Sequence, residues 1–86
     1  MLHYTKFNDP GHGWLEVPIA DLMFVDLAPS DFTPYSYRRG QYLYLEEDCD
    51  ASKFIKALRE TSLDFHITDL HTNDESPIRN YRSIYW

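Results

Sequence analysis

Cysteine is scarce in this sequence of 86 residues, because Cys49 is the only one. A single thiol excludes an internal disulfide and any zinc site built from Cys-x-x-Cys motifs. Long apolar runs are missing as well: the longest spans Leu22 to Val25, whereas a membrane helix needs about 20 apolar residues. The opening residues, MLHYTKFNDP, lack the charged and apolar regions of a signal peptide. These absences predict a soluble protein of the cytosol.

Basic residues are few relative to acidic ones. The chain has 8 Lys and Arg against 14 Asp and Glu, which gives a formal net charge of −6. Direct binding to nucleic acid requires a basic surface, so this balance argues against a nucleic-acid-binding protein. It is compatible with a solvated acidic surface, or with a partner protein whose own surface is basic. At this length we expect one domain covering residues 1–86.

Motifs for catalysis and metal binding are also missing. The four histidines show no His-x-His or His-Glu-x-x-His spacing, no serine lies in Gly-x-Ser-x-Gly, and the acids lack the spacing of a calcium loop. The sequence therefore predicts no enzyme activity, no cofactor and no metal site. The alternative is a small metal-dependent nuclease or hydrolase that uses His12, His66 and the acids.

The first part of the chain has the patterns of two strands and one helix. Residues 2–8 alternate in polarity, and residues 14–17 give a short strand that would pair back on the first across a loop rich in Pro and Gly. Pro18 opens a segment, from 18 to 25, with apolar residues at helical spacing. A loop bounded by prolines then occupies residues 28–34.

The central stretch, residues 35–58, predicts a hairpin followed by a helix. Gly40 supplies the positive φ that a tight turn needs, and residues 41–45 form the strand after it. From Ala51 onward, apolar residues recur at the 3.6-residue period of an α-helix. The stretch is therefore expected to organise the fold.

The last part of the chain predicts one more strand. Residues 63–70 alternate cleanly between apolar and polar side chains. Ser76 and Pro77 are typical of a helix start, so residues 76–86 are expected to be a helix, with a last strand as the alternative. The patterns together predict an α+β domain, a small antiparallel sheet of four to five strands with two to three helices packed on one face. The expected core consists of Leu15, Val17, Ile19, Leu22, Met23, Tyr42 or Leu43, Leu45, Phe54, Ile55, Leu58, Phe65 and Ile67.

The strongest polar signal is the acidic junction that precedes the central helix, which consists of Glu46, Glu47, Asp48 and Asp50. Its simplest interpretation is a helix N-terminus, where Asp48 or Asp50 accepts hydrogen bonds from the first free amides and the other acids face solvent. Divalent-metal binding is a second interpretation. A third is mimicry of a nucleic-acid backbone, in which Asp64 and Asp69 extend the acidic surface if the last strand lies beside the hairpin.

Tyrosine is abundant, with seven residues, and aromatic residues make up 16% of the chain. These rings exceed what so small a core encloses, so some should pack at its edge and others should contribute to an interface. We predict Tyr37 and Tyr44 as anchors for a partner. Stacking on single-stranded nucleic acid would need a positive groove, for which the only candidates are Arg38, Arg39, Arg79 and Arg82.

Three segments together resemble a group of small uncharacterised acidic proteins of bacteriophages and proteobacterial mobile elements. They are DPGHGWLEVP at residues 9–18, YSY at 35–37 and YLEEDCD at 44–50. The likeness covers about two thirds of the chain and implies a context rather than an activity or a set of site residues. Small acidic phage proteins are often inhibitors of host machinery, and anti-CRISPR proteins are among them.

The sequence thus predicts a non-enzymatic protein-binding module, an anti-CRISPR-like inhibitor that blocks the basic, nucleic-acid-binding surface of a host protein. The acidic junction, Asp64 and Asp69 would carry the charge, and Tyr37 and Tyr44 would anchor the partner. No direct binding to nucleic acid or membranes is expected. A structural subunit that forms a homodimer is the remaining alternative.

Overall fold

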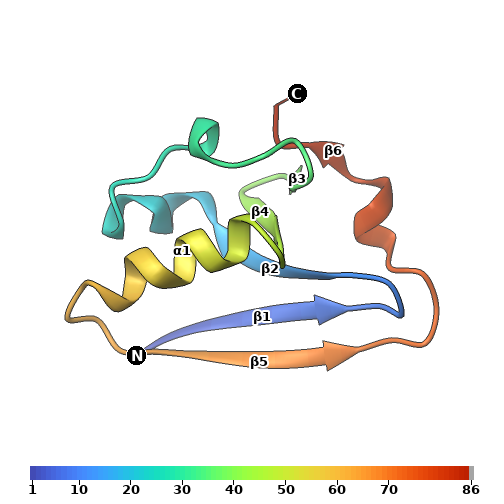
Figure 1. Cartoon of the computed structure of the whole chain (residues 1–86), viewed down its shortest axis with the longest axis horizontal. Helices are drawn as coiled ribbons and strands as arrows, with labels where there is room; N and C mark the ends of the chain where they lie inside the picture. Colours follow the sequence, from blue (N-terminus) through green and yellow to red (C-terminus); the bar gives the residue numbers. More distant parts are fainter. Residues whose placement is uncertain (86) are drawn as a thin grey trace.

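The computed structural model describes residues 1–85, within which six strands form one mixed sheet in the order β5-β1-β2-β4-β3-β6 (Figure 1). The strands are β1 Leu2–Asn8, β2 Gly13–Pro18, β3 Tyr37–Arg39, β4 Tyr42–Glu46, β5 Phe65–His71 and β6 Arg82–Ser83. The same residues contain one α-helix and three 3₁₀ helices, which are α1 Asp50–Arg59, η1 Ile19–Phe24, η2 Pro29–Asp31 and η3 Pro77–Asn80. The α+β class is confirmed, with more strands and fewer α-helices than predicted.

The antiparallel part of the sheet follows from local sequence patterns. β1 and β2 form the predicted hairpin, with Phe7 opposite Trp14. β3 and β4 form the second hairpin, and Gly40 between them has a φ of 58°, as its tight turn requires. β4 also pairs antiparallel with β2, with Leu45 opposite Leu15, so the two hairpins join in one sheet.

β5 shows that the prediction of a purely antiparallel sheet is wrong. The strand pairs in parallel with β1, with Ile67 opposite Tyr4, and forms one edge of the sheet. Between β4 and β5 the chain passes through α1, which carries it back along the sheet, so that β5 runs in the same direction as β4 (Figure 1). The position of the strand in the sequence, Phe65–His71, agrees with the prediction for residues 63–70.

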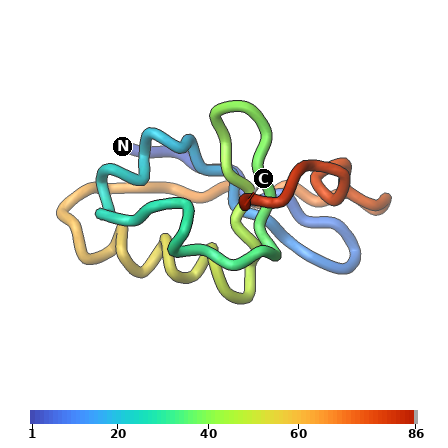
Figure 2. The backbone as a smooth tube through the Cα atoms, turned by 90° about the horizontal axis from the view of Figure 1, so that it is seen from above, coloured from blue at the N-terminus to red at the C-terminus, as the bar shows by residue number. Residues whose placement is uncertain are grey.

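The core lies between α1 and one face of the sheet, and Figure 2 shows α1 along one side of the strands. The Phe54 side chain is fully buried, and its ring meets that of Tyr4 edge-on, with centroids 5.4 Å apart. Burying one side chain of this size contributes roughly 1.5–3 kcal/mol to stability. Most of the predicted core residues lie in this cluster or pack against it, and of the two alternatives Tyr42 and Leu43, Leu43 is the buried one.

The segment predicted as an α-helix from 18 to 25 is instead the 3₁₀ helix η1. A 3₁₀ helix has three residues per turn rather than 3.6, so a predicted inward face does not keep its orientation. Leu22 is buried as expected, whereas Met23 is 80% exposed and is a wrong core prediction.

The C-terminal segment also departs from the prediction. The expected helix over 76–86 is only the 3₁₀ helix η3, which starts after Ser76 as the sequence indicates. The short strand β6 follows and pairs with β3, so the alternative of a last strand is partly right. Trp86 lies outside the described residues.

Candidate functional site

The face of the sheet opposite α1 carries a second cluster of aromatic and apolar side chains. Its buried members are Trp14, Tyr44 and Ile78, and its partly buried members are Phe7, Tyr37 and Tyr81. Those on strands point to this face because they alternate with the core residues of the same strands. Within residues 1–85 no α-helix covers this face, and the segment after β5, which returns to β3, contributes Ile78 and Tyr81 (Figure 1).

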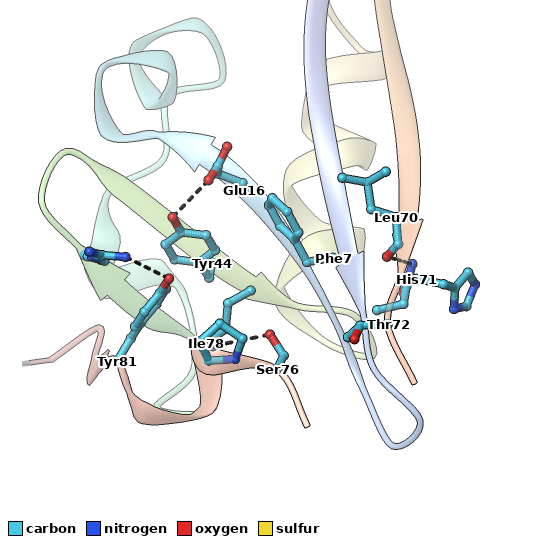
Figure 3. A pocket seen from close by; sticks show the side chains of 12 residues that line it. Phe7, Glu16, Tyr44, Leu70, His71, Thr72, Ser76, Ile78 and Tyr81 are labelled. Carbon is cyan, nitrogen blue, oxygen red and sulfur yellow. Dashed lines mark hydrogen bonds between the residues drawn. The ribbon is translucent and has the colours of Figure 1, made fainter. Parts of the chain in front are cut away.

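An open pocket of about 470 Å³ lies between this cluster and the end of β5 (Figure 3). Three rings form much of its wall: the centroids of Tyr44 and Tyr81 are 5.0 Å apart, and those of Phe7 and Tyr44 are 6.5 Å apart. The volume is in the range of small-molecule sites. We refer to it as the aromatic pocket, defined by Phe7, Glu16, Arg39, Tyr44, Ile78 and Tyr81.

Two side chains of opposite charge border the aromatic pocket. The Tyr44 hydroxyl donates a hydrogen bond of 2.9 Å to the carboxylate of Glu16. Burial raises the pKa of Tyr44, and this hydrogen bond raises it further, so the hydroxyl remains a donor. Arg39 donates a hydrogen bond of 3.1 Å to the Tyr81 hydroxyl and lies 5.2 Å from the centre of that ring. The pocket therefore has both a carboxylate acceptor and guanidinium donors in its lining.

A buried ion pair holds the C-terminal segment against the loop between β1 and β2. The Asp9 carboxylate accepts hydrogen bonds from Arg79 Nε at 2.6 Å and Arg79 Nη2 at 2.9 Å, and also from the Ser76 amide at 2.9 Å. The amides of Gly11 and His12 complete its partners. The Arg79 guanidinium, and next the Ser76 amide, hold the pKa of Asp9 well below its usual range. Asp9 therefore fixes one wall of the aromatic pocket through Arg79 and Ser76.

The Asp9 contacts predict a specific loss of stability in acid. Because its pKa is lower in the folded than in the unfolded chain, the ionised carboxylate stabilises the fold above a pH of about 4, and this contribution is lost as the pH falls further. Asp9→Asn should lower the melting temperature at neutral pH, and the gap to wild type should narrow in acid. Circular dichroism melts at pH 7 and about pH 3 test this.

Asp74→Asn is the matched control, since it removes an exposed carboxylate from the same C-terminal segment. This variant should melt like wild type at both pH values. A constant gap between Asp9→Asn and wild type across the pH range would contradict the role given to Asp9.

The acidic junction does not form the exposed acidic surface that the sequence predicted. Asp50 is fully buried and Glu46 is only 8% exposed, so two of the four acidic residues are buried. Asp50 accepts hydrogen bonds from the amide and hydroxyl of Thr33 and from the hydroxyl of Ser36. The Ser36 oxygen in turn accepts from the Glu46 amide at 3.0 Å. Asp50 thus ties the loop before β3 to the start of α1.

The prediction that Asp48 or Asp50 caps the central helix is wrong. Cys49 occupies the N-cap position of α1 without a side-chain hydrogen bond, and Asp50 is the first helical residue. The Glu46 carboxylate instead holds the turn just before the helix, where it accepts from the amides of Asp48 at 3.0 Å and Cys49 at 3.1 Å. Asp48 is exposed, and Glu47 forms an ion pair of 3.2 Å with Lys6.

Asp64 and Asp69 lie at the opposite side of the sheet from the hairpin. β5 neighbours β1, and two strands separate it from β4, so the condition for a continuous acidic surface with the acidic junction is not met. Both aspartates are exposed, and Asp69 accepts a hydrogen bond of 3.1 Å from the Asn8 amide group. Of the predicted anchors, Tyr44 is buried and Tyr37 is half-buried against Trp14. The structure does not bring the eight predicted residues together.

β5 presents a free backbone edge instead. The Leu2 amide donates to the Asp64 carbonyl, and the Thr72 amide donates to the Asn8 carbonyl. Because backbone groups alternate in direction along a strand, residues 66, 68 and 70 face β1 and residues 65, 67, 69 and 71 direct their amides and carbonyls away from it. Within residues 1–85, β5 pairs with no strand other than β1.

The alternative prediction of a metal-dependent nuclease or hydrolase relied on His12 and His66, and these two histidines lie far apart. His66 lies on β5 beside His3 at the beginning of β1, with ring centroids 6.1 Å apart. His12 follows the other end of β1, roughly 20 Å away along seven residues of strand. In the described part of the chain, no three His, Cys, Asp or Glu side chains group in a way that could hold a metal ion.

The sequence reasoning missed three contacts that shape this face. They are the pairs Asp9–Arg79 and Glu16–Tyr44 and the arrangement of Arg39 over Tyr81. The partners of the first are 70 positions apart, and no local pattern links them. The second could have been found only with the register of β2 and β4 known, because the two residues are direct cross-strand neighbours.

Comparison with models of known protein families, with curated proteins and with solved structures finds no match for this chain. The resemblance to phage proteins therefore stays a prediction. Among residues 1–85, no helix has the length and apolar character needed to cross a membrane.

Proposed function

We propose that this protein is a non-enzymatic binding module that takes up an extended, basic segment of another protein along β5. The observation that carries the proposal is the free edge of this strand, which spans seven residues, Phe65–His71. Proteins usually protect such an edge with Lys, Pro or a bulge, because its unpaired amides and carbonyls accept another strand. β5 contains neither Lys nor Pro.

The charge along this edge supports a basic occupant. Between Arg59 and Arg79 the chain has no Lys or Arg, whereas it has five acids in the same interval. Lys6 on the neighbouring β1 is engaged with Glu47. A basic strand added to β5 would gain main-chain hydrogen bonds from the edge and favourable electrostatics from Asp64 and Asp69.

A second part of the proposal concerns which class of protein supplies the basic segment and what binding does to that protein. Extended basic segments are typical of proteins that contact nucleic acid through Lys and Arg. A chain that occupies such a segment competes with the nucleic acid, so we propose an inhibitor of a nucleic-acid-binding host protein that acts in the cytosol. In this proposal Asp64 and Asp69 keep their predicted role, and the acidic junction has none because two of its carboxylates are buried.

A peptide titration tests the proposal without knowledge of the natural partner. The ¹⁵N-labelled full chain is titrated with a peptide of about nine residues that alternates Lys and Thr, and with a Glu–Thr peptide of equal length. The basic peptide should shift the amide signals of residues 65, 67, 69 and 71 and slow their hydrogen exchange. Because the charges are exposed, binding should weaken as salt rises.

Asp69→Pro should abolish this binding, since it removes an outward amide at a position where an edge strand tolerates proline. Asp69→Lys keeps the amide and reverses the charge, so it should weaken binding of the basic peptide and remains informative if the proline variant unfolds. Equal binding of both peptides, or binding that Asp69→Pro leaves unchanged, would refute the proposal. A dimer that only Asp69→Pro disrupts would assign the edge to a second copy of this chain.

A further inference from the structure

A row of apolar side chains crosses three strands of the sheet and ends at the free edge of β5. Trp14 of β2 is directly opposite Phe7 of β1, and Phe7 is directly opposite Leu70 of β5. Directly opposed residues of neighbouring strands share a face, so all three lie on the face opposite α1. Trp14 is 2% exposed, Phe7 is partly buried and Leu70 is 50% exposed. Within residues 1–85, no strand continues the row beyond Leu70.

Leu70 also lines the aromatic pocket, together with Phe7 (Figure 3). Because neighbouring strands lie about 4.8 Å apart, a residue added beside Leu70 would have its Cα about 5 Å from that of Leu70 and roughly 10 Å from that of Phe7. A short side chain at this position would contact Leu70 alone. An aromatic side chain is long enough to extend over Leu70 toward the open pocket, and it forms favourable cross-strand pairs with apolar neighbours.

The charge differs between the two faces of the sheet at this edge. Among residues 1–85, the aromatic pocket is lined by one acid, Glu16, and one arginine, Arg39, besides His71, so it has no net negative charge that would attract Lys or Arg. Asp69 is exposed and points to the other face from Leu70, because side chains alternate along a strand. An occupant suits both positions if a basic residue lies opposite Asp69 and an aromatic residue, next to it in sequence, lies opposite Leu70.

We propose that the basic segment bound along β5 carries an aromatic residue opposite Leu70, next to a basic residue opposite Asp69. This register rests on the proposed function and adds to it the side chain that the partner must supply. Leu70 directs its own amide and carbonyl to β1. In an antiparallel addition, the commoner arrangement, Leu70 and the aromatic residue therefore form a non-hydrogen-bonded pair, in which Cβ atoms are only about 4.5–5.5 Å apart.

Three peptides of about nine residues, titrated into the ¹⁵N-labelled full chain, test this register. The first alternates Thr and Lys with Thr at both ends, and the second carries Trp in place of the central Thr, which leaves every Lys on the other face. The third exchanges this Trp with the Lys after it, so that composition and net charge stay the same while Trp moves to the Lys face. The second peptide should bind about tenfold more tightly than the first, because it buries an aromatic ring against Leu70, and the third should lose most of this gain.

Leu70→Thr should remove the preference for Trp and leave the backbone edge intact. Leu70 is half exposed and Thr suits a strand, so the variant should fold. It should bind the first peptide like wild type, whereas the second peptide should lose its advantage of about tenfold. Leu63→Thr is the matched control, since it removes another exposed leucine from the segment just before β5 and should keep the preference for Trp.

The results separate this register from the proposed function. Equal binding of the first and second peptides, equal binding of the second and third, or a preference for Trp that survives in Leu70→Thr would overturn the aromatic position and leave the proposed function intact. Failure of all three peptides to bind, or signal shifts in the aromatic pocket without shifts at residues 65, 67, 69 and 71, would overturn both.

Discussion

Replacing Asp50 with alanine should lower the free energy of unfolding by about 3–5 kcal/mol. The Asp50 side chain is fully buried and is the shared acceptor for the amide and hydroxyl of Thr33 and the hydroxyl of Ser36. Alanine leaves these buried donors without a partner, and each unsatisfied group costs about 1–3 kcal/mol. A chain of this length has a total stability of about 4–13 kcal/mol, so the variant should be close to unfolding. Urea denaturation followed by circular dichroism measures the loss.

Two further substitutions make the Asp50 result specific. Asp50→Asn keeps one acceptor oxygen in the same place, so it should cost about half as much as alanine. Asp48→Ala removes an exposed acid two residues away, and a surface substitution of this kind should change stability by less than about 0.5 kcal/mol. If Asp48→Ala destabilised the protein as much as Asp50→Ala, the distinction between a buried and an exposed half of the acidic junction would be wrong.

Replacing Trp14 with alanine should lower the free energy of unfolding by about 3–5 kcal/mol, because it opens a cavity in the cluster on the face of the sheet opposite α1. Trp14 is only 2% exposed, and Tyr37 lies against its ring at 6.2 Å between centroids. The Arg79 guanidinium lies 5.3 Å from the centre of the same ring. Circular dichroism is the suitable probe of unfolding, since the substitution removes one of two tryptophan fluorophores.

Trp14→Phe should lower the free energy of unfolding by less than about 1.5 kcal/mol, since phenylalanine keeps most of the apolar volume. The indole Nε1 is buried and has no hydrogen-bond partner within the described residues, so its removal should leave no acceptor unsatisfied. A cost for Trp14→Phe equal to that of Trp14→Ala would mean that the indole N–H makes a stabilising contact in solution.

Residue types alone predicted the position of the candidate sites only in part. The acidic junction was conspicuous in the sequence, yet two of its carboxylates are buried, as acceptors for the loop at Thr33 and for the Asp48 and Cys49 amides just before α1. Composition gave no sign of this, because a carboxylate faces inward only where tertiary contacts supply donors. Conversely, the arginines were the candidates for a positive groove in an acidic chain, and strand pairing places Arg38 beside Arg82, 44 positions later in the numbering.

Sequence alone determined the features that depend on neighbours in the chain. Alternating polarity predicted β1 and β5, and the apolar residues that follow the loop rich in Pro and Gly predicted β2. The left-handed position at Gly40 predicted the turn of the central hairpin, and the helical period from Ala51 predicted α1 and its inward face. These signals are local because strands and helices repeat over two to four residues, and because glycine adopts positive φ without steric cost.

Only the tertiary structure decided which edges and faces remain free. The parallel pairing of β5 with β1, the Asp9–Arg79 ion pair and the meeting of β3 with β6 each join residues more than 40 positions apart. Such pairings follow from the way whole elements pack around the core, since α1 must cover one face of the sheet before β5 can reach its edge. The free edge of β5, which carries the proposed function, belongs to this second class.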